Sequence, residues 1–276
     1  MANYSTIKGF NIQSLASDPY TSTAASGTWA SGNSMNTARQ YPEGAGTTAA
    51  GLMSGGQDGP LKNESEEFNG TSWVEGNNLL TARTNSGGAG TQTAAMNCGG
   101  GIPSDTTNNE LYDGTCWSEG NNLNTGRQGL VTAREGSNTA ALVYGGPNSA
   151  ITEKWNGTSW TEVNDLLTVT KDGAGAGTST AALCMGGDNG PSGAIYSNVL
   201  QSYDGTSWSS STAFNTARNQ LSGLGTQTEA LIFGGKIPPG TTLSALTEYW
   251  DGSTWTEVAD LGTGKREAGE AGDVTA

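Results

Sequence analysis

The chain has 276 residues, of which 43 are glycine and only 14% are charged, and its formal net charge is −14. This negative balance repels nucleic acid and anionic membranes, so we expect neither as a partner. No apolar stretch approaches the roughly 20 residues of a membrane helix, and the first residues lack the apolar core of a signal peptide. We therefore expect a soluble protein that is not inserted in a membrane and not exported by the general secretory route.

The first 33 residues differ from the rest of the chain. They contain one stretch that alternates apolar and polar residues, 6–12, followed by a polar segment and the sequence SGTW, which ends at Trp29. Alternation of this kind predicts a strand with one buried face. The segment 1–33 therefore predicts strand structure ahead of the first complete repeat.

Five full repeats, with a period of about 44 residues, follow over residues 34–266. Regular repeats of this length are typical of propeller blades. Each repeat contains a Gly-Thr/Ser-x-Trp motif, and because SGTW matches it, six tryptophans mark the same phase. These structural tryptophans are Trp29, Trp73, Trp117, Trp160, Trp208 and Trp255.

Each repeat predicts four strands in a constant order. A Gly/Ala-rich run comes first, then an apolar run that ends in Gly-Gly, then a run with an aromatic residue, and last the tryptophan run. An Asn-Gly or Asp-Gly pair before the last strand supplies the positive φ angles of a tight hairpin. The apolar runs do not alternate, as expected where both faces of a sheet are covered by neighbours. We predict an all-β propeller whose small first-strand residues converge on the axis.

Two charged positions recur with the tryptophans. A cation stands ten residues after five of the six tryptophans, with Thr170 as the exception, and a carboxylate stands seven residues before four of them. The same residue in several blades cannot mark one active site, so we interpret both as packing and salt-bridge elements of the repeat. The recurring cations are Arg39, Arg83, Arg127, Arg218 and Lys265.

The C-terminal residues 267–276 look like the first strand of another unit, with no apolar strand after it. Residues 1–33 hold what that unit lacks. We therefore expect one domain over residues 1–276, with six four-stranded antiparallel blades, the last assembled from both chain ends so that no edge strand is exposed. The alternative is five blades, with residues 1–33 as an arm that docks on another protein.

The combination of Gly-Gly, an aromatic residue and Trp in each unit resembles the kelch repeat, a four-stranded propeller blade, from about residue 27 onward. The phrases NTAR, GAGTQTAA and NGTSW, with the opening MANYSTIKGFNIQSLASDP, resemble the kelch-like proteins of marine bacteriophages, which are predicted virion or tail-fibre components. This chain departs from the usual kelch pattern in keeping four residues, rather than six, between the aromatic residue and Trp. The resemblance implies a non-enzymatic structural protein of the phage virion, exposed on a tail fibre, appendage or capsid.

Catalytic chemistry finds little support in the sequence. The chain has no histidine, which excludes Ser-His-Asp and Cys-His nucleophile pairs, imidazole metal sites and the copper chemistry of some kelch-fold oxidases. Cys98, Cys116 and Cys184 occupy slots that other residue types fill in neighbouring repeats, so we interpret them as filler. Asp188 and Asn189 could bind calcium, but a surface turn is favoured. We expect no cofactor, no metal and no enzymatic activity.

The loops after the Gly-Gly pairs differ in length and chemistry, whereas the Asn/Asp-Gly turns barely vary. All of these loops emerge on one face, because each follows the same strand, and loops on a rigid scaffold often carry recognition. We predict that this face contacts a host-surface glycan or another virion protein, or further copies of the chain in a homo-oligomer. A loop face that merely tolerates change is the alternative. The candidate binding residues are Asp58, Lys62, Asp105, Asn148, Asp188, Asn189, Tyr196 and Lys236.

Two other functions stay open at this point. A free, lectin-like carbohydrate-binding module fits the fold equally well, and it would be a monomer that is not found in particles. A polysaccharide-degrading enzyme would need two carboxylates that converge in a cleft, whereas most of the acidic residues here recur once per repeat.

Overall fold

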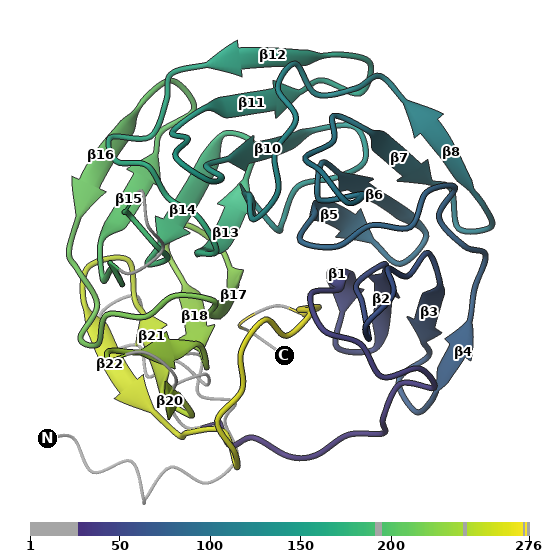
Figure 1. Ribbon diagram of the computed structural model, residues 1–276. Coiled ribbons are helices and arrows are strands. Elements are labelled where there is room, and N and C mark those ends of the chain that lie inside the picture. The colour runs from purple at the N-terminus through teal and green to yellow at the C-terminus, as the bar shows by residue number, and fades with distance from the viewer. Residues whose placement is uncertain (1–26, 191–194, 240–241, 273, 275–276) are drawn as a thin grey trace, which may run out of the picture.

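Short strands separated by glycine-rich turns form a ring of four-stranded sheets (Figure 1). The structure is a computed structural model that describes residues 27–190, 195–239, 242–272 and 274. Five sheets, numbered blades 1 to 5 in chain order, stand side by side around a central axis. Every sheet is antiparallel, and its strands follow chain order from the axis to the rim. The chain is therefore an all-β propeller.

The strands of the five blades have the following bounds. Blade 1 contains β1 (Glu43–Thr47), β2 (Ala50–Ser54), β3 (Ser65–Phe68) and β4 (Trp73–Glu75). Blade 2 contains β5 (Gly87–Thr91), β6 (Ala94–Cys98), β7 (Asn109–Tyr112) and β8 (Trp117–Gly120). Blade 3 contains β9 (Val131–Thr132), β10 (Ala141–Tyr144), β11 (Thr152–Trp155) and β12 (Trp160–Val163). Blade 4 contains β13 (Ala174–Thr178), β14 (Ala181–Met185), β15 (Leu200–Tyr203) and β16 (Trp208–Ser211). Blade 5 contains β17 (Ser222–Gly225), β18 (Ala230–Phe233), β21 (Thr247–Trp250) and β22 (Trp255–Val258), with a small hairpin of β19 (Lys236–Ile237) and β20 (Thr242–Leu243) between its second and third strands.

A side-chain cap sets the turn before the rim strand of every blade. In blade 1, Asn69 Oδ1 accepts hydrogen bonds from the backbone N–H groups of Thr71 and Ser72 at 3.0 and 2.9 Å. The turn spans four residues and places Phe68 opposite Trp73, so it is longer than the two-residue hairpin loop that Asn-Gly often signals. The same cap is made by Asp113, Asn156, Asp204 and Asp251.

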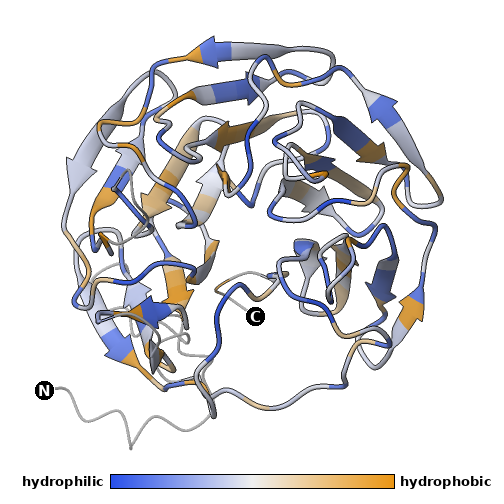
Figure 2. Cartoon of the chain, in the orientation of Figure 1, coloured by the Kyte–Doolittle hydropathy of each residue, from blue (hydrophilic) through white to orange (hydrophobic). Residues whose placement is uncertain are grey.

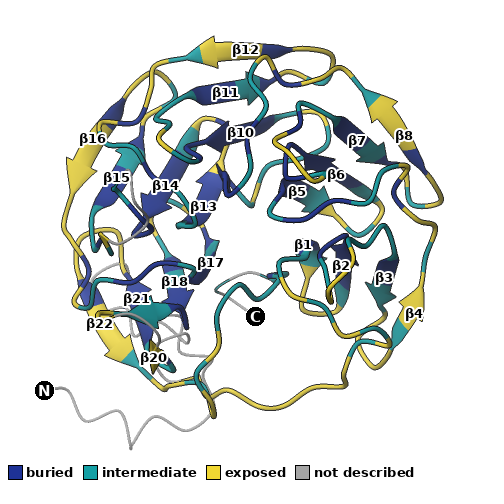
Figure 3. Ribbon diagram, viewed as in Figure 1, coloured by how far each residue is buried: buried dark blue, intermediate teal, exposed yellow. Residues whose placement is uncertain are grey.

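The hydrophobic core lies between blades rather than around one centre. Four buried clusters are found among the described residues, and each joins two consecutive blades. Their side chains come mainly from the second strands and the tryptophans, and the second strands are the most hydrophobic (Figure 2). The rim strands are largely exposed (Figure 3). Each blade is therefore stabilised by burial against its neighbours.

Six complete blades are not confirmed, because the described residues form five four-stranded sheets. Much of the predicted N-terminal contribution, residues 1–26, lies outside the described residues. The predicted inner strand at 267–276 is not a strand in its described part, but residues 267–272 run along β1 beside the axis (Figure 1). The N–H of Gly272 donates to the carbonyl of Gly46 at 2.9 Å. A methyl group at Gly44 would overlap the backbone carbonyl of Glu270, so the two segments pack closely.

Candidate functional site

Buried arginines join neighbouring blades at the repeated charged positions. The main chain of Arg83 bonds to blade 1, since its N–H donates to the carbonyl of Lys62 at 3.1 Å. Its guanidinium forms an ion pair with Glu110 of blade 2, and these side chains are 0% and 1% exposed. Arg83 Nη1 also donates to the carbonyls of Gly99 and Asn108. The equivalent pairs are Arg39 with Glu66, Arg127 with Glu153 and Arg218 with Glu248.

The connection into blade 4 replaces this ion pair with neutral groups. Thr170 stands at the arginine position, and Gln201 stands at the glutamate position. Gln201 Oε1 accepts a hydrogen bond from the N–H of Leu167 at 2.8 Å, as the glutamates do from the same connection in other blades. The cation and the carboxylate are therefore exchanged together, which avoids a buried unpaired charge.

The rim tryptophans contact both their own blade and the blade before it. Each of the five blade tryptophans packs on the aromatic residue opposite it, with ring centroids 5.0–5.3 Å apart. Trp117 Nε1 also donates to Ser65 Oγ of blade 1 at 3.0 Å. Trp29, although 40% exposed, makes the corresponding bond from Nε1 to Thr247 Oγ1 of blade 5 at 3.1 Å. The five blade tryptophans are Trp73, Trp117, Trp160, Trp208 and Trp255.

An asparagine four residues after Trp links four of the six rim segments to the next blade; Thr212 and Ala259 stand at the other two positions. Asn77 Nδ2 donates to the carbonyl of Thr115 at 2.5 Å, and the same bond occurs from Asn121 and Asn164. Asn33 makes it to Thr71 of blade 1 at 2.5 Å. The segment around Trp29 and Asn33 therefore contacts blade 5 on one side and blade 1 on the other, in the way that a rim strand does.

Six equivalent residues encircle the axis on one face of the propeller. Each stands twelve residues after a tryptophan and has a left-handed backbone, with φ between 51° and 59°. Four consecutive links of the ring are backbone hydrogen bonds of 2.8–3.0 Å, each from the N–H of one residue to the carbonyl of the previous one. The six residues, called the axial ring below, are Tyr41, Asn85, Gly129, Asp172, Gln220 and Glu267.

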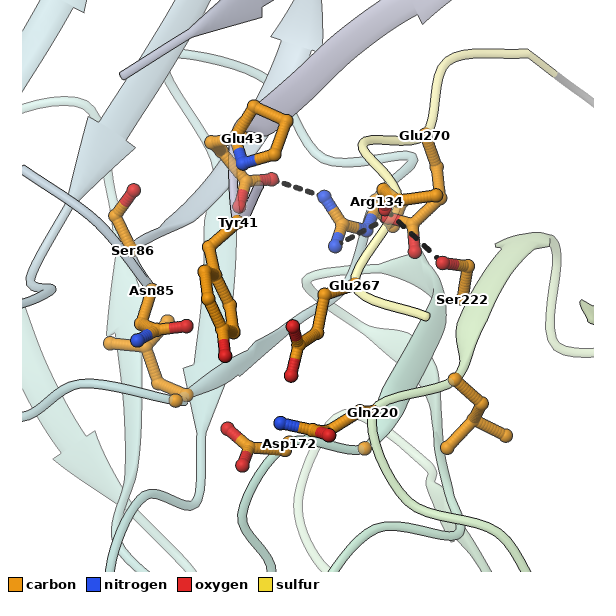
Figure 4. A pocket seen from close by; sticks show the side chains of 16 residues that line it. Tyr41, Glu43, Asn85, Ser86, Arg134, Asp172, Gln220, Ser222, Glu267 and Glu270 are labelled. Carbon is orange, nitrogen blue, oxygen red and sulfur yellow. Dashed lines mark hydrogen bonds and ion pairs between the residues drawn. The ribbon is translucent and has the colours of Figure 1, made fainter. Parts of the chain in front are cut away.

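The axial ring combines one backbone conformation with six different residue types. A left-handed backbone costs least for glycine and little more for Asn and Asp, but it is unfavourable for larger side chains such as Tyr41. Gly129 avoids the cost, Asn85 and Asp172 bear little of it, and the other three residues bear it in full. The other five side chains gather around one hollow (Figure 4), which encloses about 500 Å³, part of it open to solvent. We call this hollow the axial mouth. Strain of this kind concentrates at functional sites.

A buried ion-pair cluster forms the floor of the axial mouth. Arg134, which replaces the glycine of the other first strands, pairs with Glu43 of β1 and, at 2.6 Å, with Glu270 (Figure 4). Glu270 Oε1 also accepts a hydrogen bond from the N–H of Gly223 at 3.2 Å. The cluster thus ties the C-terminal segment to blades 1, 3 and 5. Arg134 also lines a second hollow farther along the axis, so its side chain separates the two spaces.

Burial disfavours charge on the acidic groups of the mouth. It raises the pKa of Glu43 to about 7, and it raises the pKa of Glu270, in each case against the opposing effect of Arg134. Burial also raises the pKa of Asp172 and of Glu267. The pKa of Tyr41 rises to about 12, through burial and then through the Glu267 carboxylate, so its hydroxyl is a hydrogen-bond donor at neutral pH.

The predicted binding loops lie on the same face as the axial mouth. The residue after Gly-Gly pairs with the residue just before the ring residue, as Gln57 does with Gln40. In blades 1 to 3, the predicted residues lie on three separate loops, one for each blade. Lys62 Nζ pairs with Asp58 at 3.1 Å within one loop, and Asp105 and Asn148 are exposed on the next two.

The remaining predicted residues come from blades 4 and 5. Asp188 is 5% exposed, and its Oδ1 accepts hydrogen bonds from the backbone of its own turn. Asn189 Nδ2 donates to Ser197 Oγ at 3.0 Å, and Tyr196 pairs through its backbone with Asp188. Lys236 lies close enough to lower the pKa of both acidic ring residues. Of the predicted binding residues, Lys236 and Asp188 are therefore the two whose charges shift the pKa of an acidic side chain in the axial mouth.

The cysteines show no sign of reactivity. Cys98 and Cys184 are buried, and burial raises the pKa of each to about 12. Cys116 is exposed in a rim turn, where the Asp113 carboxylate raises its pKa. Within residues 27–190, 195–239, 242–272 and 274, no group of three or more Cys, Asp or Glu is placed to hold a metal ion.

Sequence reasoning missed the axial mouth and its floor. The signal for the ring is a position twelve residues after each tryptophan that stays polar or glycine but never repeats. The signal for the floor is the charge in first-strand runs that otherwise consist of small residues: Glu43, Arg134, Glu135 and Glu270. Both signals are departures from the repeat rather than parts of it.

Comparison with protein-family models and with curated proteins finds no match. No helix in the part of the chain that the structure describes is long and apolar enough to cross a membrane.

Proposed function

We propose that this propeller is a non-catalytic recognition module that binds its partner with the axial mouth and the loops around it. One observation carries the proposal: five unlike polar side chains are held on an unfavourable backbone conformation around one hollow. A scaffold alone gains nothing from that strain, because glycine fits the same position, as Gly129 shows. Since the hollow opens on the face of the variable loops, mouth and loops together can form one contact surface.

The proposed setting is the surface of a phage particle. The resemblance of the repeats and of the opening residues to kelch-like phage proteins supports this setting, as does an acidic chain with interlocked blades. A virion propeller would attach to a host-surface glycan, to a neighbouring virion protein, or to both through opposite faces. We propose no catalytic step, because the buried carboxylates of the floor are occupied by Arg134.

We also propose that the ring is completed as a sixth, kelch-like blade. A hollow of about 1430 Å³, open to solvent, lies between the segment at Trp29 and blade 5, and Phe233, Leu261 and Lys265 line it. Trp29 packs on Phe233 with centroids 4.9 Å apart, as Trp208 packs on Tyr144 of the preceding blade. The rim and axis positions of a sixth blade are thus occupied, and residues 6–24 have the length to supply its two middle strands.

Deleting residues 2–24 tests this completion of the ring. Under the six-blade proposal, the deletion exposes Phe233 and lowers the melting temperature of the whole propeller, which thermal unfolding followed by tryptophan fluorescence would detect. Under the five-blade alternative, in which the segment is a docking arm, the truncated protein melts at the native temperature.

Two measurements test the proposed function. Mass spectrometry of purified phage particles should find the protein in stoichiometric amount, whereas its absence from particles would overturn the virion setting. Fluorescently labelled protein should adsorb to host cells in a saturable way, and exchanging the loops after Gly-Gly in blades 1, 2, 4 and 5 for the loop of blade 3 should reduce adsorption. Native adsorption after that exchange would remove the loops from the proposed surface.

A further inference from the structure

The axial mouth holds a buried carboxylate whose hydrogen-bonding capacity is only partly used within the described part of the chain. The Glu267 side chain is 7% exposed, and its polar neighbours are Arg266 and the Tyr41 hydroxyl, fewer than the roughly four hydrogen bonds that a carboxylate can accept. Arg266 Nε lies 3.5 Å from Oε2, which makes an ion pair but not a hydrogen bond. The Tyr41 hydroxyl faces the same carboxylate (Figure 4). Buried carboxylates usually accept several hydrogen bonds, so Glu267 is suited to a ligand that donates them.

The groups around Glu267 offer a mixed set of donors and acceptors. Asp172 adds a second carboxylate, Gln220 and Asn85 add amides, and Tyr41 adds a hydroxyl beside an aromatic face. Carboxylates and amides are planar and can each engage two neighbouring polar groups of a ligand. Adjacent ring hydroxyls of a sugar present donors and acceptors in such pairs. An aliphatic or purely anionic ligand would leave most of these groups unsatisfied.

Charge at the mouth favours a neutral ligand. Four carboxylates, on Glu43, Asp172, Glu267 and Glu270, are matched by four nearby cations. A fifth carboxylate, on Asp188, is engaged by the amides of its own turn. Five carboxylates against four cations leave a formal charge of about −1 at the mouth, which is small beside the −14 of the whole chain. The four cations are Arg134, Lys171, Lys236 and Arg266.

The hollow is small and shallow in relation to a polymer. Its 500 Å³ includes space that is open to solvent, and Arg134 closes the floor. A glycan would therefore enter by one end, with a single ring inside the mouth and the rest of the chain among the loops.

We propose that the axial mouth binds one neutral pyranose unit at the exposed end of a glycan, with Glu267 and Asp172 accepting hydrogen bonds from its hydroxyls. This proposal rests on the proposed recognition function and names its ligand. Gln220 and Tyr41 complete the contact, and the loops read the following sugar units. No bond is made or broken in this step.

The test uses the full-length protein and a panel of methyl hexopyranosides, with methyl glucuronide and methyl glucosaminide as charged counterparts. Binding is measured by ligand-observed NMR titration. Glu267→Gly removes the carboxylate while keeping a residue that accepts the left-handed backbone, as Gly129 does, so the variant should fold. Glu119→Gln is the matched control, because it removes an exposed carboxylate from rim strand β8, which belongs to neither the mouth nor the loops.

We expect at least one neutral glycoside to bind saturably, Glu267→Gly to weaken that binding by about tenfold or more, and Glu119→Gln to leave it unchanged. Saturable binding of the charged glycosides alone, native affinity in Glu267→Gly, or no binding of any panel member would overturn the ligand assignment. Adsorption to host cells, measured in parallel, separates the two proposals. If the native protein adsorbs and Glu267→Gly adsorbs equally well, the sugar assignment fails and the recognition function stands.

Discussion

Side chains recur from unit to unit at the rim of this propeller, whereas at the axis only a backbone conformation recurs. At the rim, the repeat places the same residues in blade after blade: a capped turn, a tryptophan, an asparagine link and a buried arginine. At the axis, the repeat keeps one left-handed backbone position and changes the side chain in every unit. Repetition of side chains marks the residues that hold blades together, whereas repetition of backbone alone marks a frame on which different side chains converge.

The comparison also separates two kinds of buried charge. Each rim arginine meets one carboxylate and at least two carbonyl oxygens, and among their guanidinium nitrogens only Arg127 Nη2 is buried without a partner in the described part of the chain. At the axis, one cation serves two carboxylates, and a third carboxylate, on Glu267, has only Arg266 and Tyr41 as polar neighbours. The buried ion pairs of the rim therefore stabilise the fold, whereas the carboxylates at the axis retain unused hydrogen-bonding capacity.

The largest expected effect comes from breaking a rim pair. Arg83→Ala leaves Glu110 buried without its cation and should lower the free energy of unfolding by about 3–5 kcal/mol, measured by urea denaturation. The double variant Arg83→Thr, Glu110→Gln introduces the neutral residues that stand at the equivalent positions in the connection into blade 4. This double variant should be more stable than Arg83→Ala alone. Equal losses in the two proteins would show that lost packing, rather than an unpaired charge, sets the cost.

A smaller effect is expected from the floor of the mouth when pH changes. Burial raises the pKa of Glu43 in the folded protein to about 7, from an ordinary value of 4.5. The folded state then binds the proton more tightly than the unfolded state, so the stability from protonated Glu43 is complete below about pH 4.5 and is lost as pH rises through 7. Relative to Glu43→Gln, the native protein should lose about 1–3 kcal/mol between pH 4.5 and pH 8. Parallel pH profiles of the two proteins, measured by thermal unfolding, would contradict this.

The smallest expected effect is a gain in stability at the axial ring. Gln220→Gly removes a left-handed glutamine, with φ 53°, at a position where Gly129 shows that glycine fits. Relief of strain exceeds the added entropy of the unfolded chain, so the variant should be more stable by about 0.5–1 kcal/mol. Urea denaturation of the variant beside the native protein measures this difference. A loss of stability would mean that the glutamine side chain, rather than the backbone ring, supports the fold.

Much of this architecture is predictable from the sequence, because it depends on residues that recur at fixed offsets. The tryptophan and Gly-Gly spacing predicts four-stranded blades in the right places, and the charged positions that pair across blades are visible as columns. The axial ring is not predictable in this way. Its members share a φ angle but not a residue type, so no recurring residue marks them in the sequence. The floor cluster joins Glu43, Arg134 and Glu270 from distant parts of the chain, a proximity that only the closed ring creates.

The number of blades is the point at which sequence and structure differ. The sequence favours six, and five four-stranded blades are found among the described residues. The difference has a local origin, because a sixth blade would take its middle strands from residues 1–26, which lie outside the described residues. The rim and axis contacts of Trp29, Asn33 and Glu270 resemble those of a blade position.

The most direct test of the account is to measure stability and adsorption together in one variant with Tyr41→Gly, Gln220→Gly and Glu267→Gly. We expect this protein to melt at or above the native temperature, because three side chains on left-handed backbone are removed. We also expect it not to adsorb to host cells, because the mouth has lost three of its polar side chains. A variant that melts at or above the native temperature and adsorbs like the native protein would contradict the central claim that the axial mouth is a recognition site.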